Sequence, residues 1–338
     1  MAFDHPEFDG HEEVVWFHDA ASGLKAITAL HRVRGKAALG GIRFLPYPNE
    51  NAALTDVLRL SRAMSYKWAL TGLGFGGGKS VVIADPATKT PELLRSVGRC
   101  IETLGGRYLG APDVGSSASD MTFVRETTAY VAGLPGSDTA VPTAKGLFHA
   151  IEAMARAKLG VSDLTGVCVA VQGAGGVGGR LCHHLAEAGA AVKVADTDAS
   201  VCAAVVQSTG AEMVDVDQIQ RTPADIFSPC ALGAVLSQHT IPSLGAQLIC
   251  GAANNQLAEV DDADRLTAAG ITWAPDYVVS AGGILGGARE IGEITEAECE
   301  QRLLDIGGTL MKVLDKAEAG SLNTDQAAKA MALEMLGE

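Results

Sequence analysis

The amino-acid sequence predicts an α/β protein of two domains. The chain has 338 residues, about twice the length of a common domain. In its second half, apolar strand-like segments alternate with helical ones, which is the pattern of βαβ units in a doubly wound parallel sheet. The chain has 40 glycines, and they form clusters at 40–41, 72–78, 173–179 and 282–287. Such clusters mark places where the backbone approaches a neighbour closely, so we expect functional residues there.

The composition excludes several classes of protein. A formal net charge of −14 with 47% hydrophobic residues is typical of a soluble globular protein and argues against nucleic acid or an anionic membrane as a partner. No apolar run approaches the roughly 20 residues that cross a bilayer, and the acidic N-terminus lacks an apolar signal segment. The seven cysteines stand singly and the histidines show no ligand spacing. We therefore expect a cytoplasmic protein with reduced thiols and no metal site.

The first half predicts a domain of strands and helices. The spacing of apolar residues predicts, in order, strands and turns over 12–46, a helix over 51–68, a β-branched strand from Lys79 after the glycine run, a helix over 91–104, a short strand over 107–110 and a helix over 117–130. Pro, Gly, Ser and Asp cluster in the loop 134–142, which indicates a boundary. We place the first domain at residues 1–134.

The second half predicts the parallel sheet with its helices. The expected elements are a helix over 144–158, a strand over 166–172, a helix over 176–189, a strand over 191–196, a helix over 198–208 and strands near 225–230, 247–251 and 271–275. Thr295 and Glu298 form a capping box at the start of a long amphipathic helix, and a last helix follows about Thr324. We place the second domain at 135–322 and expect the C-terminal helix, 323–338, to return to the first.

A glycine motif in the second domain indicates a dinucleotide. Gly173, Gly175 and Gly178 have G-x-G-x-x-G spacing directly after an apolar strand and at the start of a helix. The next strand ends in Asp196, where a carboxylate accepts from a ribose 2′-hydroxyl and repels a 2′-phosphate. No Lys or Arg occurs in 194–202 to favour that phosphate, so the sequence predicts NAD rather than NADP. A tight strand–helix turn without a ligand is the alternative.

Three polar residues of the first domain are candidates for chemistry, and each has a structural alternative. Lys67 projects from the apolar face of its helix or serves as a cation near the helix C-terminus. Lys79 faces a ligand beside three glycines or reaches solvent from the strand end. Asp113 is a functional carboxylate or an N-cap. If the two lysines share a site, repulsion and burial lower one ammonium pKa, and that lysine can act as a base near neutral pH.

Together these segments resemble the amino-acid dehydrogenase family of glutamate, leucine, phenylalanine and valine dehydrogenases, and most of all its leucine and phenylalanine branch. The stretches that carry the resemblance are LGGIRF (39–44), MSYKWALTGLGFGGGKSVV (64–82), APDVGSSASDM (111–121), VPTAKG (141–146), VQGAGGVG (171–178), SPCALGA (228–234), GAANNQL (251–257) and APDYVVSAGG (274–283). The resemblance implies an N-terminal α/β substrate domain, which also forms a homo-oligomer, and a C-terminal Rossmann-type dinucleotide-binding domain separated from it by a cleft.

The same resemblance implies roles in the first domain. Lys67, with the backbone N–H groups of Gly40 and Gly41, holds the substrate carboxylate. Lys79 activates water for attack on an imine carbon, and Asp113 exchanges protons with the amine. The implied reaction is oxidative deamination: the Cα hydrogen leaves as hydride to NAD, and water hydrolyses the imine to a 2-oxo acid and ammonia.

Further roles are implied in the second domain. Thr143 and the Asn254–Asn255 pair approach the nicotinamide and the substrate amino group, with Asn254 preferred for the substrate and the choice between the two left open. The implied cofactor-binding residues are Gly173, Gly175, Gly176, Val177, Gly178, Asp196, Thr143 and Asn254.

Substrate choice depends on an apolar pocket. Leu39 stands where glutamate dehydrogenases carry a lysine that pairs with the side-chain carboxylate, so glutamate is disfavoured. The other pocket positions that the resemblance implies are Ala111, Ile284 and Gly287, with ordinary core packing as the alternative. Pro112 departs from the leucine-type pattern, and Gly287 is smaller than its leucine-type counterpart. These features favour phenylalanine or another large apolar or aromatic L-amino acid, with leucine or valine as the alternative.

The sequence argues against two functions other than amino-acid oxidation. A 2-hydroxy-acid dehydrogenase needs a His paired with a carboxylate near the nicotinamide, and no His occurs in 66–121. A catalytically inactive NAD-binding sensor or structural subunit would have lost Lys79 or Asp113, and both are present.

Overall fold

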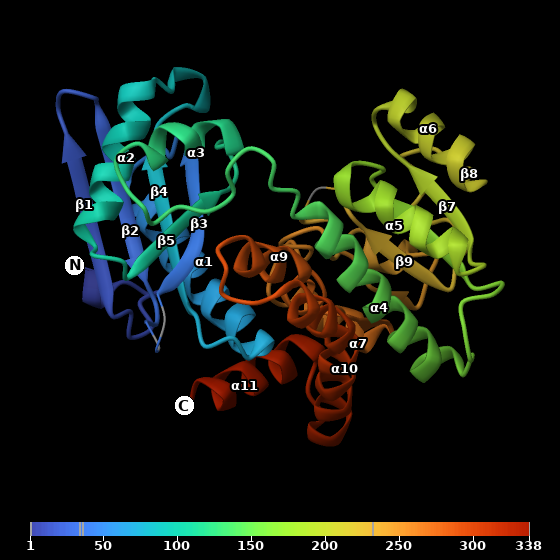
Figure 1. The fold of residues 1–338 in the computed structure, drawn as a ribbon. Helices are drawn as coiled ribbons and strands as arrows, with labels where there is room; N and C mark the ends of the chain where they lie inside the picture. The colour runs from blue at the N-terminus through green and yellow to red at the C-terminus, as the bar shows by residue number, and fades with distance from the viewer. Residues whose placement is uncertain (1, 34, 36, 232, 338) are drawn as a thin grey trace. The chain divides into compact units, whose positions relative to one another are not determined.

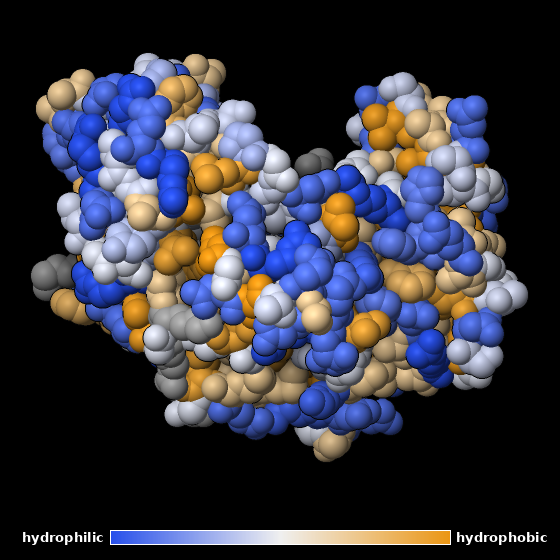
Figure 2. All heavy atoms as spheres, in the orientation of Figure 1, coloured by the Kyte–Doolittle hydropathy of each residue, from blue (hydrophilic) through white to orange (hydrophobic). Residues whose placement is uncertain are grey.

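The computed structural model of the protein describes residues 2–33, 35, 37–231 and 233–337. The chain divides into two compact units (Figure 1): the first comprises 1–137, 290–293 and 335–338, and the second comprises 138–289 and 294–334. Over the described residues, no helix is both long and apolar enough to cross a membrane. On the face drawn in Figure 2, hydrophilic side chains predominate and apolar ones form small separate groups.

The first unit is built on a mixed five-stranded sheet of order β1-β2-β4-β3-β5. Its strands are β1 (Glu13–Asp19), β2 (Leu24–Leu30), β3 (Ala38–Leu45), β4 (Gly76–Ile83) and β5 (Tyr108–Pro112). Strand β2 pairs antiparallel with β1 and β4, whereas β3 pairs parallel with β4 and β5. The two strands beside β3 therefore run in its direction, and their carboxyl ends meet at one edge of the sheet.

The last three glycines before Lys79, Gly76 to Gly78, belong to β4, whereas the sequence predicted a strand that begins at Lys79. A Cβ atom at Gly77 would lie 2.1 Å from Ser65 N, and one at Gly78 would lie 2.7 Å from the Tyr108 ring. These glycines let helix and strand neighbours approach the central strand closely.

Helices cover both faces of this sheet. They are α1 (Glu50–Thr71), α2 (Pro91–Thr103) and α3 (Ala118–Arg125). Helix α1 packs Val57 and Leu58 against Ile27, Ala29 and Val81 of β2 and β4. The opposite face of the sheet packs against α2 and α3 through a larger apolar cluster, which includes Ile42, Val82, Leu94, Ile101 and Met121.

The helix expected over 117–130 is shorter than predicted. It ends at Arg125, with Ser117 and Asp120 forming a capping box at its start. After Glu126 the chain leaves the helix because its threonine side chains bind α2: Thr127 Oγ1 donates to Arg95 O (2.8 Å) and Thr128 Oγ1 to Glu102 (2.7 Å).

The second unit contains a fully parallel six-stranded sheet of order β11-β10-β9-β6-β7-β8. Its strands are β6 (Cys168–Gln172), β7 (Ala191–Ala195), β8 (Glu212–Met213), β9 (Ile226–Pro229), β10 (Leu248–Ile249) and β11 (Thr272–Trp273). The chain order reverses between β6 and β9, which is the switch point of a Rossmann-type doubly wound sheet. The predicted fold class of each unit is confirmed.

The helices of the second unit begin with α4. Their bounds are α4 (Ala140–Leu159), α5 (Gly176–Glu187), α6 (Ala199–Thr209), α7 (Asp262–Ala268), α8 (Asp276–Val279), α9 (Gly282–Glu290), α10 (Glu296–Gly320) and α11 (Thr324–Leu336). The 3₁₀ turns found in the described part of both units are η1 (Ala2–Asp4), η2 (Pro86–Thr88) and η3 (Ile241–Ser243). The Thr295–Glu298 capping box is present at the start of α10. The sequence did not predict α7, α8, α9 or the two-residue strand β8, since all are short.

The C-terminal helix differs from expectation. Residues up to 334 cluster with the second unit, and only 335–338 cluster with the first. Two contacts anchor α11 in the second unit: Asn323 Nδ2 donates to Asp264 Oδ1 (2.7 Å), and Tyr277 OH donates to Asp325 Oδ1 (3.1 Å). The expected boundary near residue 134 lies close to the division at 137.

Candidate active site

The polar candidates of the first unit lie on one face of β3 and its neighbours. Side chains alternate along a strand, so Leu39, Gly41 and Arg43 share a face of β3. Gly41 is in close contact with two of the predicted residues: a Cβ atom there would lie 2.6 Å from Asp113 Cβ and 3.0 Å from Lys79 Nζ. The predicted residues Gly41, Lys79 and Asp113 are thus brought together, because β4 and the end of β5 both lie beside β3. Leu39 shares their face but lies two residues earlier on β3, level with Gly77 and Leu109.

Lys79 and Asp113 form a buried ion pair. Lys79 is 5% exposed, and its Nζ lies 2.9 Å from Asp113 Oδ2. The same Oδ2 accepts from Arg43 Nε at 2.8 Å. Asp113 is therefore held by two cations through a single oxygen.

Burial and charge shift both pKa values. Burial is the main cause that lowers the pKa of the Lys79 ammonium; Asp113 opposes this shift and Arg43 reinforces it. Burial acts to raise the pKa of Asp113, but the charges of Lys79 and Arg43 outweigh it, and the pKa of this carboxyl falls below its ordinary value. The arrangement favours a lysine that gives up its proton beside a carboxylate that stays ionised.

Arg43 links this pair to a second carboxylate. Its Nη1 donates to Asp56 Oδ2 at 3.0 Å, and Tyr47 OH donates to the same oxygen at 2.5 Å. Burial raises the pKa of the Tyr47 phenol, and the neighbouring Asp56 adds to this effect. The phenol therefore stays protonated and acts as a donor.

The hydroxyl of Tyr108 holds the backbone at Gly40 and Gly41. Tyr108 OH is within hydrogen-bond distance of both carbonyl oxygens, Gly40 O at 3.0 Å and Gly41 O at 3.1 Å. The register of β3 with β4 pairs Leu39 and Ile42 but skips both glycines. Lys67 lies on α1 with a half-buried side chain.

The loop after β5 fixes Asp113. The backbone N–H of Asp113 donates to Ser116 Oγ (2.9 Å), and Ser116 Oγ donates to Ile42 O (2.7 Å). Lys89 Nζ donates to Gly115 O at 2.8 Å and pairs with Asp120. The N-cap of the following helix is Ser117, so the capping alternative for Asp113 does not hold.

In the second unit, the glycine motif forms the turn between β6 and α5. Gly173 has φ +99°, and a Cβ atom at Gly178 would lie 1.9 Å from Gly173 O. Gly175 is the N-cap of α5, and a Cβ atom there would meet nothing within 4 Å. The exposed amino end of α5, with Gly176 and Val177 in its first turn, fits the pyrophosphate of a dinucleotide.

Asp196 follows the carboxyl end of β7 beside this turn. Its Oδ2 accepts from Ala174 N at 2.6 Å, and its Oδ1 accepts from Asp198 N at 2.8 Å. Thr197 Oγ1 also donates to Oδ1, at 3.5 Å. Since a carboxylate has about four lone-pair sites, Oδ2 keeps capacity for a ribose hydroxyl.

The other predicted residues of the second unit lie on α4, α9 and the loop after β10. Thr143 Oγ1 donates to Thr139 O (2.7 Å), and a Cβ atom at Gly283 would lie 2.9 Å from Thr143 Oγ1. Ile284 and Gly287 are one turn apart on α9, and the space around Gly287 is open. Asn254 and Asn255 are exposed, and Asn255 has a left-handed φ of 54°.

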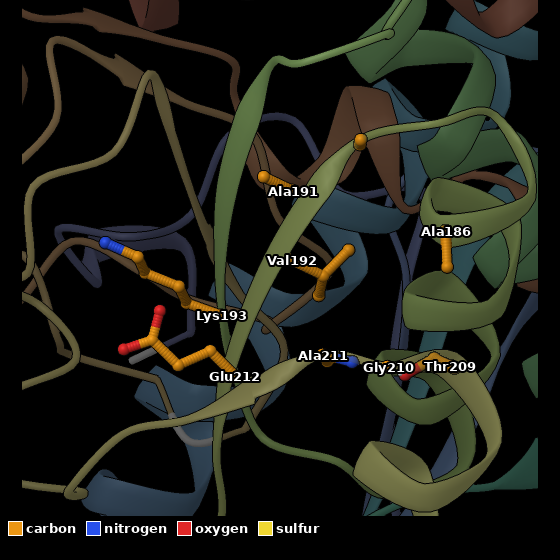
Figure 3. Close-up of a pocket in the computed structure, with 9 residues that line it drawn as sticks. Ala186, Ala191, Val192, Lys193, Thr209, Gly210, Ala211 and Glu212 are labelled. Atoms are coloured by element: carbon orange, nitrogen blue, oxygen red, sulfur yellow. Dashed lines mark hydrogen bonds between the residues drawn. The ribbon is translucent and has the colours of Figure 1, made fainter.

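A surface pocket of the second unit lies at a different place. It is lined by residues of α5, β7, α6 and β8, including Ala186, Val192, Lys193 and Glu212 (Figure 3). These residues lie toward the amino end of β7. Because ligands of doubly wound sheets bind outside the carboxyl ends of the strands, this pocket is not part of the candidate cofactor site.

Comparison with known proteins decides the family. Residues 11–130 match the profile described as Glu/Leu/Phe/Val dehydrogenase, dimerisation domain, and residues 196–337 match that of Glutamate/Leucine/Phenylalanine/Valine dehydrogenase. The chain belongs to the Glu/Leu/Phe/Val dehydrogenase family. The resemblance inferred from the sequence is confirmed.

Individual members of this dehydrogenase family are similar over nearly the whole chain. The leucine dehydrogenase of Bacillus subtilis (strain 168) is 40% identical over 99% of this chain and 93% of its own length. The phenylalanine dehydrogenase of Thermoactinomyces intermedius is 40% identical over 97% of this chain and 92% of its own. The crystal structure of L-tryptophan dehydrogenase from Nostoc punctiforme superposes with a TM-score of 0.88 at 39% identity, covering 97% and 96% of the two chains.

Membership in this family makes the protein an amino-acid dehydrogenase, an oxidoreductase that acts on CH–NH₂ donors and takes a nicotinamide cofactor. The sequence reasoning missed Arg43, Asp56, Tyr47 and Tyr108. A signal for Arg43 was present: it follows Gly41 by two residues in a strand and so shares its face. Nothing in the spacing of Asp56 or Tyr108 indicated their partners.

Proposed function

We propose that the protein catalyses NAD-dependent oxidative deamination of an apolar L-amino acid to a 2-oxo acid and ammonia, and the reverse reductive amination. The observation that carries this proposal is the buried Lys79 ammonium, 2.9 Å from Asp113 and against Gly41. A lysine of lowered pKa supplies the base that imine hydrolysis needs, and the carboxylate beside it is a group that can accept a proton from the substrate amine and return it. The similarity to leucine, phenylalanine and tryptophan dehydrogenases supports the same substrate class.

The proposed residue roles follow from the chemistry of each group. Lys67 and the N–H groups of Gly40 and Gly41 bind the substrate carboxylate. Lys79, as a neutral amine, removes a proton from water as its oxygen attacks the imine carbon, and Asp113 exchanges protons with the nitrogen that leaves as ammonia. In sum, the amino acid and water give the 2-oxo acid, ammonium and one proton, while two electrons leave Cα with a hydrogen nucleus as hydride.

The proposed cofactor is NAD. When bound, it supplies the acceptor for the Cα hydride. Gly173 to Gly178 and the amino end of α5 hold the pyrophosphate, and Asp196 accepts from the ribose hydroxyl. A 2′-phosphate would meet the Asp196 carboxylate without a nearby Lys or Arg in 194–202, which is the reason to propose NAD over NADP. Thr143 and Asn254 are proposed to contact the nicotinamide end, with Asn254 or Asn255 contacting the substrate amino group.

The proposed substrate is large and apolar. Leu39 lies on the Lys79 face of the sheet and is 6% exposed, so it gives a substrate carboxylate no partner. Leu39 and Ala111 of the first unit, and Ile284 and Gly287 of the second, are each proposed to contact the substrate side chain. The open space at Gly287 favours an aromatic or another bulky side chain. Leucine or valine is the second candidate.

A homo-oligomer is also proposed. The profile that matches the first unit is described as a dimerisation domain, and the similar glutamate dehydrogenase of Thermus thermophilus, at 23% identity, is described as hetero-hexameric. Sedimentation of the purified protein tests this, and a monomer at micromolar concentration would refute it.

The first experiment measures NADH formation with Leu, Val, Ile, Met, Phe, Trp, Glu and Ala, and repeats the series with NADP. Lys79→Ala is the inactive control, and Lys25→Ala, at an exposed lysine of β2, is the matched variant that keeps activity. Turnover of apolar substrates that Lys79→Ala abolishes supports the proposal. Binding of NADH without turnover of any substrate would favour the sensor or structural subunit instead.

A further inference from the structure

Arg43 bridges two carboxylates at the candidate site. Its Nε donates to Asp113 Oδ2 at 2.8 Å and its Nη1 to Asp56 Oδ2 at 3.0 Å. The guanidinium is mostly buried, with a side-chain exposure of 15%. A planar group held at both ends in this way has little freedom to turn, so it fixes the position of each carboxylate.

The contacts of Asp113 divide between its two oxygens. Lys79 and Arg43 both bind Oδ2. Among the described residues, no hydrogen bond to Oδ1 is found. Oδ1 is therefore the oxygen left to meet an amine, and the direction in which it points is set by the cations that hold Oδ2.

The charges of four side chains at the candidate site sum to zero only when Arg43 is present and Lys79 is protonated. Lys79 and Arg43 are positive, and Asp113 and Asp56 are negative. When Lys79 gives up its proton, Asp113 loses one of its two partners. Because a guanidinium does not deprotonate in proteins, Arg43 keeps the carboxylate paired at that moment and removes the cost of leaving it buried and alone.

Other charged groups surround this set. Asp113 after β5, Arg43 on β3 and Asp56 on α1 all act on Lys79, and Tyr108 lies close enough to Asp113 to feel its charge. Lys67 lies on α1, the helix that packs on β4. Tyr47 donates to Asp56 and so holds the far end of the bridge.

We propose that Arg43 is a positioning residue for the deamination reaction: it anchors Asp113 through Oδ2, keeps it ionised while Lys79 is neutral, and directs Oδ1 to the substrate nitrogen, with Asp56 and Tyr47 holding Arg43 in place. This inference rests on the proposed function. It assigns a role to a side chain that need not touch the substrate.

The test compares Arg43→Gln, Arg43→Lys and Asp56→Asn with a matched control, Arg95→Gln. Arg95 lies on α2 and pairs with Glu126 at the end of α3. For Arg43→Gln we expect kcat to fall about 100-fold, in the range of a misplaced acid–base group, with the KM for the amino acid changed less than threefold. The acid limb of the kcat/KM profile moves to higher pH, since Arg43 no longer disfavours the Lys79 ammonium. Arg43→Lys restores part of the rate because it keeps the charge, and Arg95→Gln changes neither quantity.

A second readout does not require turnover. Protein is prepared with isotope-labelled lysine, and the Lys79 resonance is assigned by its loss in Lys79→Arg. This resonance is then followed by NMR as the pH is varied. Its midpoint should rise by about one pH unit in Arg43→Gln, as expected when a buried neighbouring charge is lost, and should stay unchanged or fall in Asp56→Asn. An unchanged midpoint and pH profile in Arg43→Gln, or a loss of kcat that merely follows a fall in Tm, would overturn the positioning role. A wild-type protein with no turnover overturns the proposed function instead, and the titration still decides the assignment of Arg43.

Discussion

Arg43 lies opposite Asp113, one residue beyond the last pair in the register of β3 with β5. The register pairs Gly41 with Ala111 and Ile42 with Pro112, so Arg43 falls opposite Asp113, and Arg43 Nε lies 2.8 Å from its Oδ2. A one-residue shift of β5 would turn this carboxylate to the other face of the sheet. Strand register therefore determines which groups meet at the candidate site.

Lys79→Ala should abolish deamination and leave cofactor binding intact. Removal of a general base costs about 10²–10⁴-fold in rate, and Lys79 lies in a different unit from the glycine motif. Steady-state kinetics and NADH fluorescence titration measure the two effects. The Lys25→Ala control should match the wild type in both, and more than a tenth of the wild-type kcat in Lys79→Ala would exclude Lys79 as the base.

The rate of deamination should rise with pH along an acid limb whose midpoint lies below the pKa of free lysine. Burial lowers the pKa of Lys79, and only the neutral amine accepts the proton from water. The measurement is kcat/KM between pH 6 and 11 at saturating NAD. A midpoint at or above about 10.4, the value of an unperturbed lysine, would contradict the proposed role.

Stability should fall in acid as Asp113 is protonated. The folded-state pKa of this carboxyl is lowered, so the stability that it contributes is present above the unfolded pKa of about 3.9 and is lost as pH falls through the folded value. Urea unfolding of wild type and Asp113→Asn between pH 2 and 7 tests this. The two curves should converge at the lowest pH, and a constant difference would show that the charge of Asp113 does not stabilise the fold.

Gly41→Ala should reduce activity by about 100-fold. The new methyl group would lie 2.6 Å from Asp113 Cβ and 3.0 Å from Lys79 Nζ, so the buried pair must move. Gly308→Ala on α10 is the matched control, since a Cβ atom there meets nothing within 4 Å and alanine favours a helix by up to about 1 kcal/mol. Equal kinetics in the two variants would show that the pair tolerates the displacement.

Gly175→Ala and Gly178→Ala should separate cofactor binding from folding. A Cβ atom at Gly175 meets nothing within 4 Å, whereas one at Gly178 lies 1.9 Å from Gly173 O. We expect Gly175→Ala to keep the wild-type Tm and bind NADH at least tenfold more weakly, because its methyl group enters the space proposed for the pyrophosphate. Gly178→Ala should lower Tm as well. Unchanged NADH affinity in Gly175→Ala would place the cofactor elsewhere.

Much of the fold could be predicted because local signals agreed with the final structure. The capping box at Thr295, the β-branched strand after the glycine run and the G-x-G-x-x-G turn each depend on neighbours in sequence. The helix expected to reach residue 130 stops at Arg125 because Thr127 and Thr128 bind distant residues of α2. The C-terminal helix was assigned to the first domain, but contacts of Asn323 and Asp325 with residues far back in the chain hold most of it in the second unit.

The sequence by itself determined the residue types available for chemistry: two lysines, one aspartate, and glycines at the points of close approach, in an order shared with amino-acid dehydrogenases. Only the tertiary structure decided that Lys79 and Arg43 share a single oxygen of Asp113 and that Asp56 and Tyr47 lie behind them. The reason is physical. Spacing along the chain reports which face of a strand or helix a residue occupies, whereas contacts between residues 43, 79 and 113 arise from the pairing of three strands, and that pairing is set by the packing of the whole sheet.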